Sequence, residues 1–415
     1  MSQNPAATDA KPASKASPGP NNPIRVDETE TRERILVAAE SLVEKTLAST
    51  FTLKQIAEVL NIHYTAVYHY FRNRDDVELQ LINRYSQRRS RNLANAQQRP
   101  GNALERLTAF IDAEMHEVPT PLLISGRSTL APAFREKAIA AYKRNRIEVA
   151  EVLKLGVADG SMRHLDPHIA SHVITRTLDR FANQHENVLS SAELTTDDLS
   201  KSLIEFFTHG ILGREKTWTP PPPDPKHMFQ PLKMNQLDNM LRSATAAFNR
   251  QGFRGTSIPQ VAKSMGLSKT SFYRFAATKE DLLDLCAQHS FNLIGQMRQA
   301  ARIISENPLD ALLQDLYFSR QLLKREPGPT LSPYLYNALP EQRQRAAKET
   351  FKSFRFDLIA LLQQCVDDGR TLSFNPYAIQ SMITACANIP IRDVDEAQGY
   401  LDPVVELVLY GIESR

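Results

Sequence analysis

The chain has 415 residues, a length that predicts two or three domains and excludes a single small module. Apolar residues make up 42% and charged residues 23% of the sequence, which excludes a disordered or fibrous chain. Lys and Arg total 50 against 47 Asp and Glu, so the net charge of +3 does not by itself indicate a nucleic-acid partner. An argument for such a partner must come from local clusters of charge.

Cysteine usage and hydropathy bear on the compartment. Cys286, Cys365 and Cys386 are an odd number without CxxC spacing, which disfavours a disulfide framework or a zinc site. Buried inert thiols are favoured over a redox sensor. No apolar run approaches the ~20 residues that span a bilayer, and the first 23 residues lack the hydrophobic region of a signal peptide. We therefore expect a cytoplasmic protein with no membrane partner.

Two breaks divide the chain. Residues 1–23 are mostly Ala, Ser, Pro, Asn and Lys, a composition that predicts a disordered tail. Residues 217–231 read TWTPPPPDPKHMFQP, and this density of proline predicts an extended linker. Between the breaks apolar residues recur with helical spacing, as at Ile35, Ala38 and Leu42, and no run of alternating residues supports a sheet. The pattern predicts an all-α protein.

A repeat lies on both sides of the linker. A shift of 205 residues lays residues 55–57 on 260–262, Tyr68 on Tyr273 and Asp76 on Asp281. With slightly different shifts, later segments match in three places: 157–160 with 366–369, 166–167 with 375–376, and 210–211 with 411–412. The repeat predicts two copies of one all-helical unit of roughly 190 residues, joined by the linker.

Each copy begins with the pattern of a helix-turn-helix. Thr52 and Gln55 form a capping-box pattern that opens a short helix, and Asn61 is a residue type that accepts the positive φ needed to end it. The second copy repeats these three positions with Ser257, Gln260 and Gly266. Small side chains at Ala57 and Ala262 allow the two helices to cross closely.

Candidate DNA-binding side chains lie in and beside these two motifs, because hydroxyl, aromatic, imidazole and cationic groups reach phosphates and base edges. In the first copy they are Thr52, His63, Tyr64, Thr65, Tyr68, His69 and Arg74. In the second copy they are Ser257, Ser268, Lys269, Thr270, Tyr273, Arg274 and Lys279. Residues 52–74 carry a net charge of +2 and residues 257–279 carry +4, so basic charge is concentrated locally.

These motifs resemble the TetR/AcrR family of bacterial repressors. The resemblance rests on the apolar stripe of the first helix, the Thr-x-x-x-Ile-Ala pattern at 52–57, and Tyr68-His69-Tyr70-Phe71 followed by a basic Arg74. It covers both heads and, more loosely, both C-terminal parts. The second copy departs from the pattern, because Phe275-Ala276 replaces Tyr70-Phe71 and an aromatic residue is lost.

The resemblance implies roles and an assembly. The tyrosines at 68 and 273 and the basic residues at 74 and 279 are expected to touch phosphates. Family members are homodimers whose last two helices form a four-helix bundle, and the corresponding stretches here are 167–187, 196–213, 376–388 and 400–412. Leu199, Leu203, Phe206 and Phe207 offer an apolar face for it. We expect an intramolecular pseudo-dimer, with a homodimer of chains as the alternative.

The expected domain boundaries follow from the breaks and the motifs. They are a disordered tail at 1–23, a first helix-turn-helix domain at 24–76, a first helical ligand and dimerisation domain at 77–216, the linker at 217–231, a second helix-turn-helix domain at 232–281, and a second helical ligand and dimerisation domain at 282–415.

Other features indicate no separate chemistry. His164, His168 and His172 are spaced like a metal-binding face, but Pro167 starts a helix after His164, so no metal site is expected. The arginines at 84, 88, 89 and 91 form either a solvated face or a contact to the DNA backbone. No catalytic motif or cofactor signature occurs, so an enzyme is not expected.

Two functional hypotheses follow. The first is a transcriptional regulator, most simply a repressor, whose binding of double-stranded DNA is controlled by an unidentified small-molecule effector. The effector pocket is expected among the apolar faces of residues 104–157 and 309–366, although the same periodicity marks an ordinary core. The alternative is a protein-interaction or scaffold protein in which one or both heads no longer bind an operator. The missing aromatic residue of the second head favours this alternative.

Overall fold

A computed structural model of the chain describes residues 28–46, 51–117, 130–192, 194–213, 216–218, 236–264, 268, 273–325, 330–387 and 402–414. Over these ranges the elements are helices, and extended pairing is limited to an isolated bridge between Met162 and Glu413. The predicted all-α fold is confirmed. None of the helices described combines the length and apolarity needed to cross a membrane. The predicted tail and residues 219–231 of the predicted linker lie outside the described ranges.

The described helices fall into two halves of the chain, 24–216 and 232–415. In the first half they are α1 (Glu28–Thr46), α2 (Leu53–Leu60), α3 (Tyr64–Tyr70), α4 (Arg74–Gln97), α5 (Ala103–His116), α7 (Pro132–Ala158), α8 (Pro167–Ala192) and α9 (Thr196–His209). In the second half they are α10 (Gln236–Gly255), α11 (Ile258–Ser264), α13 (Lys279–Ile304), α14 (Pro308–Arg325), the 3-10 helix η1 (Pro333–Ala338), α15 (Glu341–Asp367), α16 (Pro376–Ala387) and α17 (Pro403–Tyr410).

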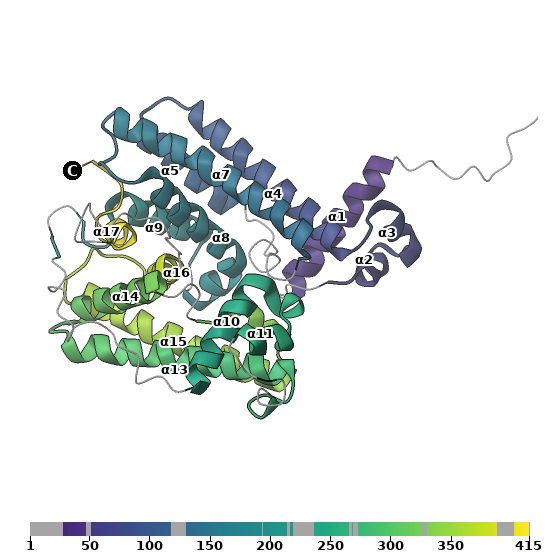
Figure 1. The fold of residues 1–415 in the computed structure, drawn as a ribbon. Helices are drawn as coiled ribbons and strands as arrows, with labels where there is room; N and C mark the ends of the chain where they lie inside the picture. Colours follow the sequence, from purple (N-terminus) through teal and green to yellow (C-terminus); the bar gives the residue numbers. More distant parts are fainter. Residues whose placement is uncertain are drawn as a thin grey trace, which may run out of the picture.

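Each half has a head and a body. Figure 1 shows α1, α2 and α3 projecting from the rest of the first half, while α10 and α11 lie beside the second half's longer helices. The predicted boundaries at 76 and 281 fall inside α4 and α13. The reason is that α4 serves two cores: Val77 and Leu79 are buried in the head, whereas Leu93 and Ala96 are buried in the body.

Four helices join the two halves. α8 packs closely on α16, and α9 packs on α16 and α17. In Figure 1 these four helices lie between the long helices of the first half and those of the second. The side chains predicted to face such a bundle are all buried: Leu199, Leu203, Phe206 and Phe207. These four helices of one chain thus pack on one another.

Main-chain hydrogen bonds cross between the ends of α9 and α17. The amide of Ile211 donates to the carbonyl of Val408 at 2.9 Å, and the amide of Ile412 donates to the carbonyl of Phe207 at 2.8 Å. Each half thus supplies an amide from its last turn and a carbonyl from its last helix. The exchange is reciprocal, as across a twofold axis.

Two glycines permit this exchange. Gly210 and Gly411 end α9 and α17 with φ of 68° and 64° and ψ of −161° and −154°. This backbone region is almost confined to glycine. A Cβ on Gly210 would lie 2.3 Å from the carbonyl oxygen of Leu409, and one on Gly411 would lie 2.3 Å from that of Thr208. Each glycine therefore fits both its own conformation and its neighbour's backbone.

A buried ion cluster ties the first body together and corrects one expectation. Arg89, which was expected on a solvated face or beside DNA, is 1% exposed. Its Nε donates to Glu114 at 2.8 Å and its Nη1 donates to Asp179 at 2.8 Å, joining α4 to α5 and α8. Of the other arginines in the run, Arg84 pairs with Glu33 at 2.5 Å. The run is therefore not one continuous basic face.

The start of the predicted linker is anchored. Trp218 is buried, its amide donates to the hydroxyl of Tyr410 at 3.1 Å, and its indole Nε1 donates to Asp310 at 3.3 Å. Both partners belong to the second half. The chain that leaves the first half is thus fixed to α14 and α17, and this anchor lies beside the bundle that joins the halves.

Candidate nucleic-acid interface

The first head has the predicted helix-turn-helix geometry. The Thr52 side chain accepts from the Gln55 amide at 3.2 Å, and the Gln55 side chain accepts from the Thr52 amide at 2.8 Å, so the predicted capping box is confirmed. Ile56 and Ala57 are buried in the head. Asn61 ends α2 with φ 52° in the left-handed region, as its residue type led us to expect.

Helix α3 presents its candidate residues to the outside. Val67 is fully buried and faces the head's core, which fixes the rotation of the helix. Tyr64 is 51% and Tyr68 is 53% exposed, and their rings meet edge to face with centroids 6.2 Å apart. Thr65 and His69 are also exposed. Aromatic and hydroxyl groups thus form one outward face of a helix that follows a tight turn.

His63 has a structural task as well as an exposed position. It is the N-cap of α3, and its side chain accepts from the Thr65 amide. The ring nitrogen Nδ1 lies 2.8 Å from the Thr65 hydroxyl oxygen. His63 therefore shapes the start of the candidate recognition helix, which lies next to the residues expected to read bases.

Arg74 is more engaged than its sequence position indicated. Its Nε donates to the carboxylate of Glu78 at 2.7 Å, and its guanidinium lies over the ring of Phe51 at 5.6 Å. Glu78 is 1% exposed, so Arg74 neutralises a buried acid. Sequence reasoning missed this partner, although the spacing of four residues on one helix was a signal for it. The expected phosphate contact of Arg74 remains a prediction.

The second head is described in part. Ser257 precedes α11, and its carbonyl accepts from the Val261 amide at 3.0 Å. Ser268, Tyr273 and Arg274 are exposed, as a DNA-contacting face requires. The candidates Lys269 and Thr270 lie outside the described residues, and so does Gly266.

Phe275 and Ala276 differ in their exposure to solvent. Phe275 is exposed, whereas Ala276 is buried in the second head's core, as Phe71 is in the first. In the second head Phe253 is partly buried and stacks on Phe248 with ring centroids 6.1 Å apart. The second head therefore keeps aromatic packing in its core without a residue equivalent to Phe71.

The side chain of Lys279 lies over the aromatic ring of Phe253. Its Nζ is 4.6 Å from the centroid of the Phe253 ring, a cation–π arrangement. Partial burial lowers the pKa of this amine. Like Arg74, it begins the long helix that leaves the head, and its expected phosphate contact remains a prediction.

Contacts connect the heads to the bodies. In the first half the Ala131 amide donates to Asp75 at 3.0 Å, just before α7 begins. In the second half Arg343 of α15 donates to Asp281 at 2.7 Å. The Asp281 pKa is lowered, mainly by its hydrogen bond with Thr278 and then by Arg343. In both halves the start of α7 or α15 therefore touches the first turn of the helix that leaves the head.

One further contact joins the first body to the second head. Arg135 of α7 donates to the carbonyls of Arg250 and Gln251 in α10, both at 2.9 Å, and to the carbonyl of Leu130 at 3.0 Å. The carbonyls of Arg250 and Gln251 lie just before Gly252, where α10 is interrupted with φ 71°. A cation suits the negative end of a helix segment. This contact holds the second head against the first half.

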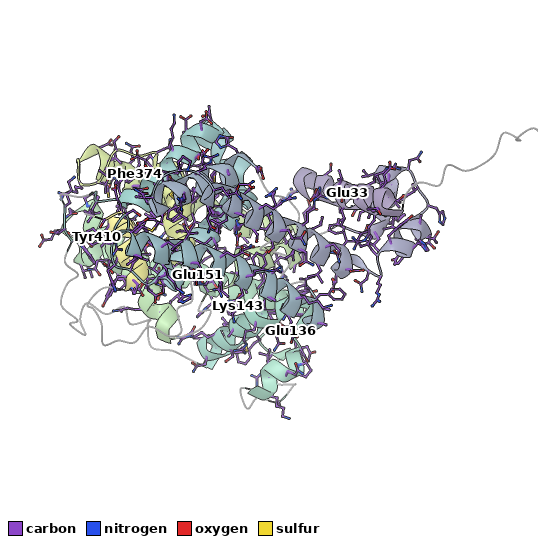
Figure 2. All side chains as sticks on the ribbon, turned by 90° about the horizontal axis from the view of Figure 1, so that it is seen from above. Glu33, Glu136, Lys143, Glu151, Phe374 and Tyr410 are labelled. Carbon is purple, nitrogen blue, oxygen red and sulfur yellow. The ribbon has the colours of Figure 1, made fainter. Side chains whose placement is uncertain are left out.

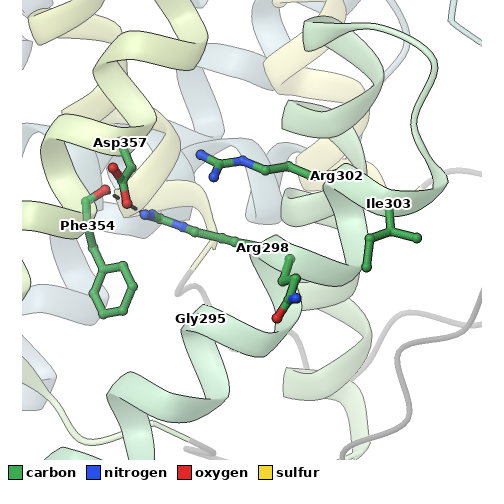
Figure 3. Close-up of a pocket in the computed structure, with 7 residues that line it drawn as sticks. Gly295, Arg298, Arg302, Ile303, Phe354 and Asp357 are labelled. Atoms are coloured by element: carbon green, nitrogen blue, oxygen red, sulfur yellow. Dashed lines mark hydrogen bonds between the residues drawn. The ribbon is translucent and has the colours of Figure 1, made fainter.

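A shallow cavity of about 280 Å³ lies between α13 and α15 in the second body. Figure 3 shows Arg298 and Arg302 extending from α13 toward Phe354 and Asp357. Arg298 is already held by the Phe354 carbonyl at 2.6 Å. Phe354 and Asp357 fall within the range 309–366 that was expected to line an effector pocket, whereas the arginines lie outside it.

The three thiols lie in the interior of the protein. Cys286, Cys365 and Cys386 are buried, and desolvation raises the pKa of each thiol to about 12. Among the residues that the structure describes, no group of three or more His, Cys, Asp or Glu side chains is placed to hold a metal ion.

Comparison with known proteins gives one sequence match and several distant structural likenesses. Residues 240–286 match the model of bacterial regulatory proteins, tetR family. No curated protein matches the chain. AibR in complex with isovaleryl coenzyme A and operator DNA is 16% identical, with a TM-score of 0.36 over 42% of this chain and 96% of that one.

Two further solved structures are similar at the same level. The fatty acid degradation regulator FadR from Bacillus halodurans is 17% identical, with a TM-score of 0.37 over 45% of this chain and 96% of its own. The ketosteroid transcriptional regulator KstR2 of Mycobacterium tuberculosis is 18% identical, with a TM-score of 0.35 over 45% of this chain and 98% of its own.

The sequence match falls on the second head, the one in which Ala276 takes the place of an aromatic residue. It covers most of α10, all of α11 and the start of α13. The matching family is described as bacterial regulatory proteins. Residues 240–286 therefore carry the sequence signature of the tetR family of bacterial regulatory proteins.

Proposed function

We propose that this chain is a transcriptional regulator in which two tetR-type units are joined in one polypeptide and bind double-stranded DNA together. The observation that carries the proposal is the four-helix bundle of α8, α9, α16 and α17, which unites two bodies that each bear a head. In such a chain the second half takes the place of a partner subunit. A monomer then has two DNA-binding heads.

The reciprocal hydrogen bonds support an intramolecular pseudo-dimer. The bundle consumes the apolar faces of α9 and α17, where Leu203 and Val408 are fully buried. A second chain would find these faces already covered. We therefore expect light scattering at micromolar concentration to report one chain mass. A stable mass of two chains at every accessible dilution would contradict this assembly.

The two heads are expected to read different half-sites. In the first head the start of α3 offers Tyr64 and Thr65, and in the second the corresponding residues are Lys269 and Thr270. A lysine donates to the acceptors on guanine, whereas a tyrosine makes weaker or more apolar contacts. Replacing Lys269 with Ala should therefore relax specificity in one half-site only, which a selection of bound sequences from random DNA would measure.

Effector control is the less direct part of the proposal. The contacts of Asp75 and Asp281 with the starts of α7 and α15 would transmit a change in either body to its head. AibR, one of the similar structures, was solved with isovaleryl coenzyme A and operator DNA. We propose that an unidentified small molecule entering a body changes the separation of the heads and releases DNA, so that the protein acts as a repressor in the cytoplasm.

A second candidate function is a protein-interaction or scaffold role. The observation that favours it is the Arg135 contact, which ties the second head to the first body and restricts its movement toward DNA. The test is binding to a labelled duplex at 50 and 200 mM salt. Heads that neutralise several phosphates must lose affinity steeply as salt rises, and a scaffold protein would show no such slope.

A further inference from the structure

The junction of the two halves contains two equivalent turns with unlike side chains. The amide of Arg163 donates to the carbonyl of Ile412 at 2.9 Å, and the amide of Leu372 donates to the carbonyl of Ile211 at 2.9 Å. Arg163 and Leu372 therefore hold equivalent positions. Each follows the long α7 or α15 helix of its own half and lies against the last helix of the other half.

Arg163 fills its position with a cation. Its Nε donates to the carbonyl oxygen of Gly411 at 2.7 Å, and its Nη1 donates to the carboxylate of Glu406 at 2.6 Å. The arginine side chain is mostly buried in this contact. A guanidinium on a short alkyl chain thus fastens the first body to α17, through one carboxylate and one carbonyl.

At the equivalent position in the second half, the same two kinds of acceptor are present, but the residue that faces them is Leu372 and not an arginine. Glu205 and Gly210 of the α9 segment correspond to Glu406 and Gly411 of α17. Leu372 cannot bind them through its side chain, which packs toward Gly213. Among the described contacts, Glu205 makes neither an ion pair nor a hydrogen bond. A cavity of about 440 Å³ lies here, lined by both Glu205 and Gly210.

The cavity combines an apolar wall with a small excess of negative charge. Its apolar lining includes Phe206, Phe374 and Ile379. Its charged lining consists of Asp198, Lys201 and Glu205. Asp198 is already used as the capping partner of Thr195, so Glu205 is the carboxylate left for a ligand. The volume falls in the range of small-molecule sites.

The cavity is remote from the first head. Figure 2 shows Phe374 and Tyr410 at the end of the molecule opposite Glu33 of α1. A ligand here would not compete with DNA for that head. It would instead touch α9 of the first half and the turn before α16 of the second half.

We propose that this cavity is a binding site for a small organic cation, a guanidinium or primary ammonium group on a short alkyl chain. The cationic group takes the place that the Arg163 guanidinium takes on the opposite side, with Glu205 as ion-pair partner and the Gly210 carbonyl as second acceptor. The alkyl chain lies against Phe206 and Phe374. The site does not depend on the proposed DNA binding.

Binding would add a second link between the halves. Arg163 already joins the first body to α17, and the bound cation would join α9 to the turn that begins at Leu372. A ligand that binds only when the two halves are packed together stabilises that packing by mass action. The cation is therefore a candidate signal acting on the junction rather than on either body.

The test uses the full chain with n-butylguanidinium, n-butylamine and the neutral isostere N-butylurea as probes. The signal is the methyl resonance of Ile379, which lines the cavity, with Ile169 of α8 as the reference methyl. Both cations should shift Ile379 saturably, with dissociation constants roughly in the millimolar range expected for so few contacts. Ile169 should stay unchanged, and butylurea should give no saturable shift.

Three variants locate the site. Glu205→Gln should weaken butylguanidinium binding at least tenfold, because a charged acceptor is lost. Leu372→Arg copies the opposite side, so it should fill the cavity, abolish probe binding and raise the unfolding temperature. Glu406→Gln changes the equivalent carboxylate on the opposite side and should leave binding at Ile379 unchanged.

Several results would overturn the proposal. These are equal shifts with butylurea, unchanged affinity in Glu205→Gln, binding that persists in Leu372→Arg, or no shift at 100-fold the expected dissociation constant. If Leu372→Arg does not fold, the comparison of Glu205→Gln with Glu406→Gln still decides. Because no DNA is present in the assay, failure of the proposed regulator function would leave these results unaffected.

Discussion

Replacing Gly411 by Ala tests whether the two halves are joined as described. The alanine Cβ would lie 2.3 Å from the Thr208 carbonyl oxygen and 2.5 Å from its carbon. These are main-chain atoms, so no side-chain rotation relieves the overlap. The backbone conformation itself, with φ 64° and ψ −154°, costs a non-glycine residue about 1–3 kcal/mol.

The loss should extend to neighbouring hydrogen bonds. Separating the two segments breaks the bonds from Ile412 to Phe207 and from Ile211 to Val408, worth about 1 kcal/mol each. With the strain, Gly411→Ala should lower the free energy of unfolding by about 4 kcal/mol. Gly210→Ala should cost about the same, since its Cβ would lie 2.3 Å from the Leu409 carbonyl oxygen.

Gly369→Ala and Gly160→Ala are the matched controls. Both glycines have positive φ, 62° and 77°, but a Cβ there meets no atom within 4 Å. Each should cost only about 1 kcal/mol. Urea unfolding monitored by circular dichroism measures the difference in the free energy of unfolding between these variants. The first transition is compared, because a chain of several domains need not unfold in one step. A loss in Gly411→Ala no larger than that in Gly369→Ala would refute the reasoning.

Three other changes probe the heads and bodies. Arg74→Ala should cost about 3–5 kcal/mol because it removes the cation that pairs with the buried carboxylate of Glu78, and adding Glu78→Leu should restore most of that stability. The reduction of the salt slope by roughly one that a phosphate contact predicts is then measured in this stable background by duplex titration. The pKa of His116 is raised, mainly by its hydrogen bond to Asp197, so its contribution is present below about pH 6.5 and lost as pH rises through the higher folded value. His116→Ala should therefore destabilise more at pH 5.5 than at pH 9, by about 0.5 kcal/mol since the pair is exposed, and an equal effect at both pH values in urea unfolding would contradict this. Burial raises the pKa of the thiols of Cys286, Cys365 and Cys386 to about 12. A thiol reagent at pH 8 should therefore label these cysteines in the native chain only as fast as the chain unfolds, and rapid labelling would disprove their burial.

Features set by local sequence were predictable. The capping box of Thr52 and the left-handed turn at Asn61 depend on residues within a few positions of each other, and both are present. The apolar face of α9 was predictable for the same reason, because helical periodicity marks the side that must be covered. The bundle that covers it was expected only from the resemblance to the TetR/AcrR family.

Features set by tertiary pairing were not predictable. Arg89 shares a run of arginines with less buried neighbours, and only the packing of α5 and α8 turns it into a buried partner of Glu114 and Asp179. That Glu406 pairs with Arg163 while the equivalent Glu205 makes no described ion pair could not be predicted either, because the residues that face these carboxylates lie in the other half. An alignment of the two copies shows the change from Arg163 to Leu372 but not what each side chain faces.

The mass of the complex with DNA tests the central claim most directly. A duplex selected from random DNA by the full chain should be bound by one chain, with two unlike half-sites at a fixed spacing, as sedimentation equilibrium of the complex would show. Two chains on a perfect palindrome would contradict the account, because each chain would then bind through one and the same head and the second half would not replace a partner subunit.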